Sequence, residues 1–228
     1  MNKSLPSQPE PPLRKDDHWP PTQPPDDSPA YYRRSPPPPK DYSLLSTIWL
    51  LFLAAFFGLA ITALAFRSYA VDGASMENTL QNNDRVIIDK IPRTLARATH
   101  HPYIPHRGDI IIFSQFGFFD NSGPATKQLI KRVVGLPSER VVIKDGRLRI
   151  YNSQQTGGFE PDHSGFYRID SQSTPGNVDL VVPAGSVFVC GDNRANSTDS
   201  RFFGPVSSAQ IVGKLVLRFW PLDQSKGF

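Results

Sequence analysis

Predominantly apolar residues run from Leu44 to Phe66, and neither a charge nor a proline interrupts this segment. As a helix, the segment would be about 35 Å long, enough to cross a hydrocarbon core of about 30 Å. The pattern therefore predicts a membrane-spanning helix over residues 44–66. A cleaved signal peptide is the alternative, since Ser68-Tyr69-Ala70 offers a small-x-small cleavage site. Signal peptides, however, have a shorter apolar core and do not follow 43 other residues.

After residue 67 the pattern changes to short β-branched runs separated by turn residues, which is typical of an all-β unit. The predicted strands are Arg85–Asp89, Asp109–Phe113, Gln128–Val134, Ser186–Cys190 and Gly213–Phe219. Asp145-Gly146 predicts a hairpin between Arg140–Lys144 and Arg147–Tyr151, because this pair accepts the positive φ values of a type I′ turn. Residues 152–180, rich in Gly, Ser, Gln and Asp, are interpreted as a small insertion. The fold class is therefore mainly β.

Composition changes the picture most at the N-terminus, where 13 of the 23 prolines fall in the first 40 residues. Proline removes backbone donors and favours extended conformations, so residues 1–43 are predicted to be a disordered tail. Arg33, Arg34 and Lys40 precede the apolar segment, whereas Arg67 alone follows it closely. This asymmetry favours a cytoplasmic N-terminus, with residues 67–228 forming one domain across the membrane.

Charge and cysteine content exclude several classes of protein. A net charge of +4, spread along the chain, does not indicate a nucleic-acid-binding protein. Cys190 is the only cysteine, so no disulfide forms within the chain. His100, His101 and His106 could suggest zinc, but their spacing matches no strong template and they are interpreted as part of a polar loop. We expect no metal and no cofactor.

Three segments carry reactive side chains. In the first, Ser75 lies in a Gly-Ala-Ser-Met turn soon after the apolar segment, where backbone amides could face an oxyanion. In the second, Lys131 lies between aliphatic neighbours of a predicted strand, and burial would lower its pKa toward that of a usable base. The third, Gly191–Pro205, combines acids, amides, hydroxyls and two arginines after an apolar strand. Each has a plain structural interpretation when taken alone: a turn serine, a surface lysine and a polar loop.

Taken together and in this order, the three segments resemble the motifs of type I signal peptidases, which are membrane-bound Ser–Lys proteases. The matching sequences are Ser75-Met76-Glu77-Asn78-Thr79-Leu80, Lys131-Arg132-Val133-Val134-Gly135-Leu136-Pro137 and Gly191–Arg201. The resemblance covers about residues 44–220. It implies a mainly β catalytic domain of coiled antiparallel sheets and, as partners, the lipid bilayer and preproteins with signal peptides. The resemblance implies a location in the plasma membrane or in a thylakoid membrane.

The resemblance also assigns roles to residues. Ser75 is expected to be the nucleophile, Lys131 the general base, and Ser197 the residue whose hydrogen bond orients the lysine amine. The residues expected to support the site are Asp192, Asp199 and Arg201. Those expected to line the substrate pocket, which accepts small residues one and three positions before the cut, are Val71, Met76, Leu80, Leu129 and Ile130.

Two positions depart from the family pattern. Asn78 stands where a proline is usual, which predicts an altered turn without loss of chemistry. Gly73 stands where some members carry a serine hydroxyl for the oxyanion, so the Ser75 N–H would serve alone. A non-catalytic, membrane-tethered β-domain that acts as an adaptor is the alternative function. A Ser–Lys protease with another target, such as a self-cleaving protein, is a further one.

Overall fold

The computed structural model describes residues 44–228, except 121–122, 164 and 170–172, so the predicted proline-rich tail lies outside the described residues. Helix α1 (Leu44–Ala65) carries no charged residue, and its Leu44–Thr62 part has a mean hydropathy of 2.4 with no burial. It is long and apolar enough to cross a membrane. The helix ends one residue earlier than predicted, because Phe66 already pairs with Asp89 in a sheet.

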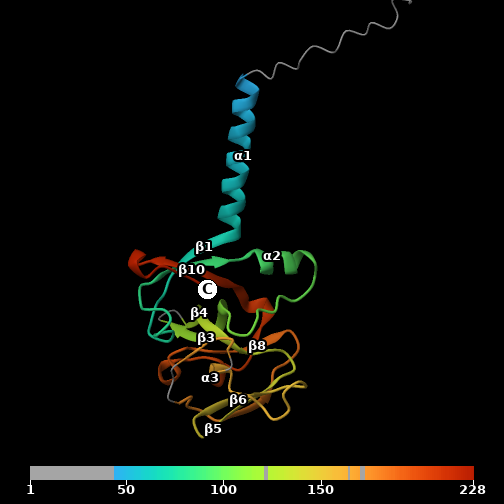
Figure 1. Cartoon of the computed structure of the whole chain (residues 1–228), viewed down its shortest axis with the longest axis vertical. Coiled ribbons are helices and arrows are strands. Elements are labelled where there is room, and N and C mark those ends of the chain that lie inside the picture. The colour runs from blue at the N-terminus through green and yellow to red at the C-terminus, as the bar shows by residue number, and fades with distance from the viewer. Residues whose placement is uncertain (1–43, 121–122, 164, 170–172) are drawn as a thin grey trace, which may run out of the picture. The chain divides into compact units, whose positions relative to one another are not determined.

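An eight-stranded antiparallel sheet forms most of the rest of the chain (Figure 1). Its order is β1-β2-β10-β3-β4-β8-β9, with β11 paired to β10. The strands are β1 (Phe66–Ala70), β2 (Arg85–Asp89), β3 (Ile110–Asp120), β4 (Gly123–Gly135), β8 (Ser186–Cys190), β9 (Val206–Ser207), β10 (Ile211–Trp220) and β11 (Lys226–Gly227). The mainly β, antiparallel fold is thus confirmed. Strands β3 and β4 are longer than predicted because they continue as a paired arm, from Ile110↔Arg132 to Asp120↔Gly123.

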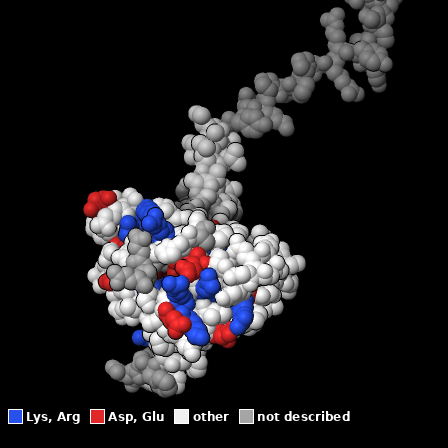
Figure 2. Space-filling view, turned by 60° about the horizontal axis from the view of Figure 1, so that its bottom comes forward, with Lys and Arg blue, Asp and Glu red and all other residues white. Residues whose placement is uncertain are grey.

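A second sheet of three strands has the order β6-β5-β7, from β5 (Arg140–Lys144), β6 (Arg147–Tyr151) and β7 (Val178–Val181). The predicted hairpin is confirmed: Asp145 and Gly146 have φ values of 51° and 75°, as a type I′ turn requires. The segment interpreted as an insertion includes the start of β7. In the view of Figure 2, basic and acidic side chains are intermixed on the surface. Arg140 and Asp179 form an exposed ion pair between β5 and β7.

Short helices connect the strands. The α-helices are α2 (Ile91–Ala98) and α3 (Ser200–Phe203), and the 3₁₀ turns are η2 (Pro161–His163), η3 (Arg194–Asn196), η4 (Ser208–Gln210) and η5 (Leu222–Gln224). Two of them follow β8 directly, so the polar segment after Cys190 is folded into turns. This arrangement holds the segment close to the sheet.

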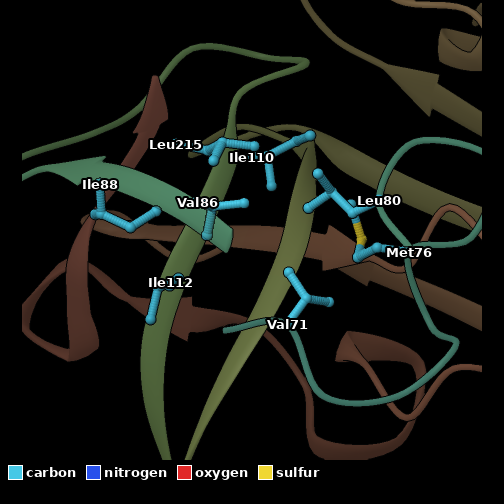
Figure 3. Close-up of a cluster of buried hydrophobic side chains, with 8 residues drawn as sticks. All are labelled: Val71, Met76, Leu80, Val86, Ile88, Ile110, Ile112 and Leu215. Carbon is cyan, nitrogen blue, oxygen red and sulfur yellow. The ribbon is translucent and has the colours of Figure 1, made fainter. Parts of the chain in front are cut away.

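Three clusters of buried apolar residues stabilise the domain. The first joins β2, β3 and β10 to the loop after β1 (Figure 3), and consists of Val71, Met76, Leu80, Val86, Ile88, Ile110, Ile112 and Leu215. The second lies between the three-stranded sheet and β8, where Val141, Ile143 and Ile150 pack near Phe188. The third, which includes Phe113 and Val189, packs around β3, β4 and β8. The loop that carries Ser75 is therefore anchored in the core at both ends.

Candidate active site

The loop between β1 and β2 places Ser75 in a tight turn. Glu77 N donates to Ala74 O and Leu80 N donates to Met76 O, so residues 74–80 form about one helical turn. Met76 and Leu80, four residues apart, point into the core together and are fully buried (Figure 3). The Ser75 side chain is left on the other side, and the Ser75 N–H donates to no described residue. The turn thus presents a hydroxyl and a free amide.

Asn78 has a φ of +78°, a left-handed conformation that proline, locked near −65°, does not adopt. Asparagine tolerates this conformation better than most residues. A proline at this position would require a different backbone conformation of the turn. Gly73, at φ +94°, donates its N–H to the side chain of Asn82.

Lys131 on β4 reaches this turn. Its Nζ donates to Ser75 Oγ at 2.7 Å and to Ile130 O at 2.9 Å. The residue is 3% exposed, and its burial lowers the pKa of the amine to about 8. The negative charges of Asp199 and Asp192 act in the opposite direction and raise this pKa, but their effect is smaller than that of burial. A buried amine within hydrogen-bonding distance of a serine hydroxyl can act as a base.

The segment after β8 packs directly against the turn of Ser75. Asn193 N donates to Ser75 O at 3.1 Å, and Asn193 Nδ2 donates to Glu77 Oε2 at 3.0 Å. A Cβ on Gly191 would lie 2.5 Å from Ser75 O and would overlap Ser197 Oγ. Only glycine fits here, because the two backbones approach each other so closely. Gly191 and Asn193 were not predicted as site residues, although both lie within the third motif.

Asp199, which is fully buried, organises this segment. It accepts hydrogen bonds from Gly191 N at 2.9 Å and Ser197 Oγ at 2.8 Å, and it forms an ion pair with Arg201. The predicted hydrogen bond between Ser197 and Lys131 is absent among the described residues: the Ser197 hydroxyl donates to this carboxylate, and Lys131 Nζ donates to Ser75 and Ile130. Ser197 nevertheless lines the same cleft as Lys131.

Asp192 binds Arg132, the neighbour of Lys131 on β4. Arg132 Nε and Nη2 donate to the two carboxylate oxygens at 2.8 and 2.6 Å, and Arg132 Nη2 also donates to Thr79 Oγ1 at 3.3 Å. One guanidinium thus joins the lysine strand, the segment after β8 and the serine turn. Arg132 was given no role from the sequence. Its place next to Lys131 in a predicted strand could have indicated that its side chain points to the opposite face of the sheet.

A cleft of about 530 Å³ opens at Ser75 and Lys131. Val71, Leu129 and Ile130, which were predicted to line the substrate pocket, all line this cleft. Met76 and Leu80 do not: the prediction for them is wrong because their spacing turns both into the core beneath the cleft. Additional lining residues that were not predicted include Tyr69, Phe118, Lys127, Asn196 and Phe202.

The cleft has one open strand edge. Residues Leu129–Lys131 of β4 pair with β3 on one side, whereas β8 pairs with β4 only from Arg132 onward. The other edge of β4 therefore faces the cleft with its backbone groups unpaired among the described strands. Such an edge can bind an extended peptide by strand addition.

Other potentially reactive groups lie elsewhere. Cys190 is fully buried, and burial raises the pKa of its thiol, so it behaves as a small apolar side chain. Within residues 44–228, apart from the gaps given above, no three His, Cys, Asp or Glu side chains are placed to hold a metal ion.

The chain is similar in sequence to known proteins. The family model described as "Signal peptidase, peptidase S26" matches residues 44–220. A signal peptidase I from Leptolyngbya laminosa is 35% identical, with 72% of this chain and 76% of the relative covered. Signal peptidase I V from Bacillus subtilis is 36% identical, with 65% and 82% covered. A solved structure of a signal peptidase I from Enterococcus faecalis matches 50% of this chain and 97% of its own, with 30% identity and a TM-score of 0.35.

Proposed function

The chain belongs to the signal peptidases of the peptidase S26 family, and from this premise we propose that it cleaves preproteins with Ser75 as nucleophile and Lys131 as general base. The observation that carries the proposal is the 2.7 Å contact between Lys131 Nζ and Ser75 Oγ, made by an amine that is 3% exposed. With a pKa of about 8, about one-tenth of the amine is neutral at pH 7. A normal lysine would be neutral in only a few parts in ten thousand.

Catalysis then proceeds in two stages. Neutral Lys131 accepts the Ser75 proton while the oxygen attacks the scissile carbonyl, and the ammonium returns this proton to the leaving amine as the acyl-enzyme forms. In the second stage the amine takes a proton from the water that attacks the ester. The ammonium then gives this proton to Ser75 Oγ as the ester bond breaks, which restores the hydroxyl and the neutral amine. The free Ser75 N–H is the backbone donor for the oxyanion, because Gly73 supplies no hydroxyl.

Asp199, Asp192 and Arg201 support the reaction by holding the segment after β8 in place. Asp199 binds Gly191 N and Ser197, and Asp192 binds Arg132 beside the lysine. None of these three lies between the nucleophile and the base. Their role is therefore to position residues and to keep water away from the amine.

Substrate specificity follows from the cleft. We propose that the peptide before the scissile bond extends along the open edge of Leu129–Lys131, where alternate side chains point to the same face. We expect the first and third residues before the cut to face Val71 and Ile130, which both line the cleft. A small-x-small cleavage site is proposed from the family resemblance.

We propose that α1 anchors the enzyme in a membrane, with the N-terminus cytoplasmic and the β-domain on the opposite side. The uncharged helix supports the anchoring, and the basic residues that precede it in the sequence support the orientation. An anchored enzyme meets its membrane-bound substrate at a raised effective concentration.

The test is cleavage of a preprotein with an Ala-x-Ala site by the full chain in detergent. Ser75→Ala and Lys131→Met should each lower turnover by at least about a thousandfold, as expected when a nucleophile or its base is lost. The exposed Ser153→Ala and Lys144→Met are matched controls and should retain wild-type turnover. Near-normal turnover by either site variant would refute the pair, and no turnover by the wild type would favour the adaptor.

A further inference from the structure

Helix α2 presents its apolar residues to the outside of the domain. Ile91 and Leu95, four residues apart, lie on one face and are 47% and 62% exposed, and Ala98 continues that face. Surface helices of soluble domains normally turn such a face toward the core. Here the half-buried Arg93 and Ala96 face the domain instead. This inverted orientation indicates an apolar partner outside the domain.

The basic residues of α2 lack acidic partners. Arg93 and Arg97 line a hollow of about 380 Å³ together with His100, His101 and other residues, none of them acidic. Neither arginine forms an ion pair with a described residue, and Arg93 Nε is buried without a hydrogen-bond partner. The helix itself has no Asp or Glu. The partner is therefore expected to carry negative charge.

The position of α2 in the chain identifies this partner. Lys90, which directly precedes the helix, donates its N–H to the carbonyl of Ala65 at 2.8 Å, and Ala65 is the last residue of α1. The start of α2 therefore lies within one hydrogen bond of the end of the apolar helix. Figure 1 draws α2 at the same end of the β-domain as β1.

We propose that α2 lies in the headgroup region of the membrane, with Ile91 and Leu95 inserted toward the acyl chains and Lys90 and Arg97 attracting anionic phospholipids. An amphipathic helix with basic residues binds a bilayer surface by this combination of apolar burial and electrostatic attraction. The proposal rests on the proposed membrane span of α1. It adds a second contact with the lipid, which fixes the β-domain against the membrane surface.

The test uses the full chain in phosphatidylcholine vesicles that contain phosphatidylglycerol and a lipid with a quencher on its acyl chain. Cys190→Ala removes the only cysteine, and an environment-sensitive fluorophore is attached through Leu95→Cys, Leu51→Cys or Lys144→Cys. Position 51 in α1 reports the span, and the exposed position 144 at the hairpin of the second sheet is the control. Quenching at 51 and 95 should exceed that at 144 several-fold.

The other outcomes separate the two proposals. Quenching at 51 with none at 95, repeated with Ile91→Cys, would overturn the contact of α2 and leave the anchor intact. No quenching at 51 would overturn the span itself, while cleavage in detergent still tests the Ser75–Lys131 pair. Lys90→Gln combined with Arg97→Gln should remove the increase in quenching at 95 that phosphatidylglycerol gives over pure phosphatidylcholine. An unchanged increase would overturn the role of these basic residues.

Discussion

Lys131 is costly to bury as a cation, and this cost is linked to its proposed function as a general base. Burial lowers its pKa to about 8, whereas a lysine in the unfolded chain titrates near 10.4. Between these pH values the unfolded chain binds more protons, so the free energy of unfolding rises with pH across this window. Below pH 8 both states are protonated, and the folded state carries the full penalty, on the order of 3 kcal/mol.

Lys131→Met should therefore abolish activity and yet stabilise the protein. Methionine keeps an unbranched side chain of similar length without the charge, so we expect a gain of about 1–3 kcal/mol at pH 7. The gain should shrink at about pH 11, above the pKa of about 10.4 that a lysine has in the unfolded chain, because the wild-type amine is then mostly neutral in both states. Thermal unfolding in detergent at both pH values measures this difference, with Lys144→Met as the control. A variant less stable than wild type at pH 7 would contradict the burial penalty.

Asn78 gives a second prediction at the level of a single residue. Its φ of +78° is incompatible with proline, so Asn78→Pro should destabilise the Ser75 turn by roughly 1–3 kcal/mol and lower turnover. Asn78→Gly should leave both nearly unchanged, since glycine adopts positive φ freely. Unfolding and cleavage measurements on the two variants provide the test. A proline variant as active and stable as wild type would show that the turn adopts the usual family conformation.

Single residues also mark the limit of prediction from sequence. The motifs predicted Ser75 and Lys131 as a pair, and the structure brings the two side chains together. Ser197 was assigned the wrong hydrogen-bond partner, because the competing carboxylate of Asp199 lies two residues away. Which of two nearby polar groups accepts a hydrogen bond depends on backbone geometry that a motif does not encode.

Among the elements, the segment before β7 is tied to the active site by a buried ion pair. Arg194, fully buried after β8, donates to Asp162 in η2 and to Thr174. The same arginine donates to Gly191 O, next to the residues that contact Ser75. The segment that looked like a variable insertion therefore helps to hold the catalytic loop.

Asp162→Asn should destabilise the protein by about 3–5 kcal/mol, because it leaves the Arg194 cation buried without its counter-charge. Turnover should fall with it, as the loop that holds Gly191 loosens. Asp179→Asn removes the partner of Arg140 in an ion pair exposed to solvent and should change little. Chemical denaturation of both variants measures the contrast. Equal effects would contradict a special role for the buried pair.

The positions of most strands were predicted more accurately than their lengths. Arg85–Asp89, Ser186–Cys190 and the Asp145-Gly146 hairpin match the structure, since β-branched residues and turn residues define them locally. The arm of β3 and β4 and the strand β7 were missed. The residues of these segments are mixed in polarity, so the local pattern does not indicate strands. Pairing of β3 with β4 and of β7 with β5 stabilises them.

At the scale of the whole molecule, the three motifs come together because the segments after β1 and after β8 meet at strand β4 of one sheet. The first apolar cluster, through Val71, Met76 and Leu80, anchors the serine turn in the core. Strand β4 supplies the lysine, and the segment after β8 packs against the serine turn. The order of the sheet, with β4 between β3 and β8, was not predictable from the sequence. It determines which faces of β4 are covered and leaves the edge of Leu129–Lys131 open at the cleft.

The central claim is that a neutral, buried Lys131 amine activates Ser75, and the pH dependence of kcat/KM tests it most directly. The measurement uses the full chain in detergent and a preprotein substrate without groups that titrate between pH 6 and 10. Because only the neutral amine accepts the serine proton, kcat/KM should rise with pH and level off, with an apparent pKa of about 8. A rise centred near 10.4, as for an exposed lysine, or no rise at all would contradict the account.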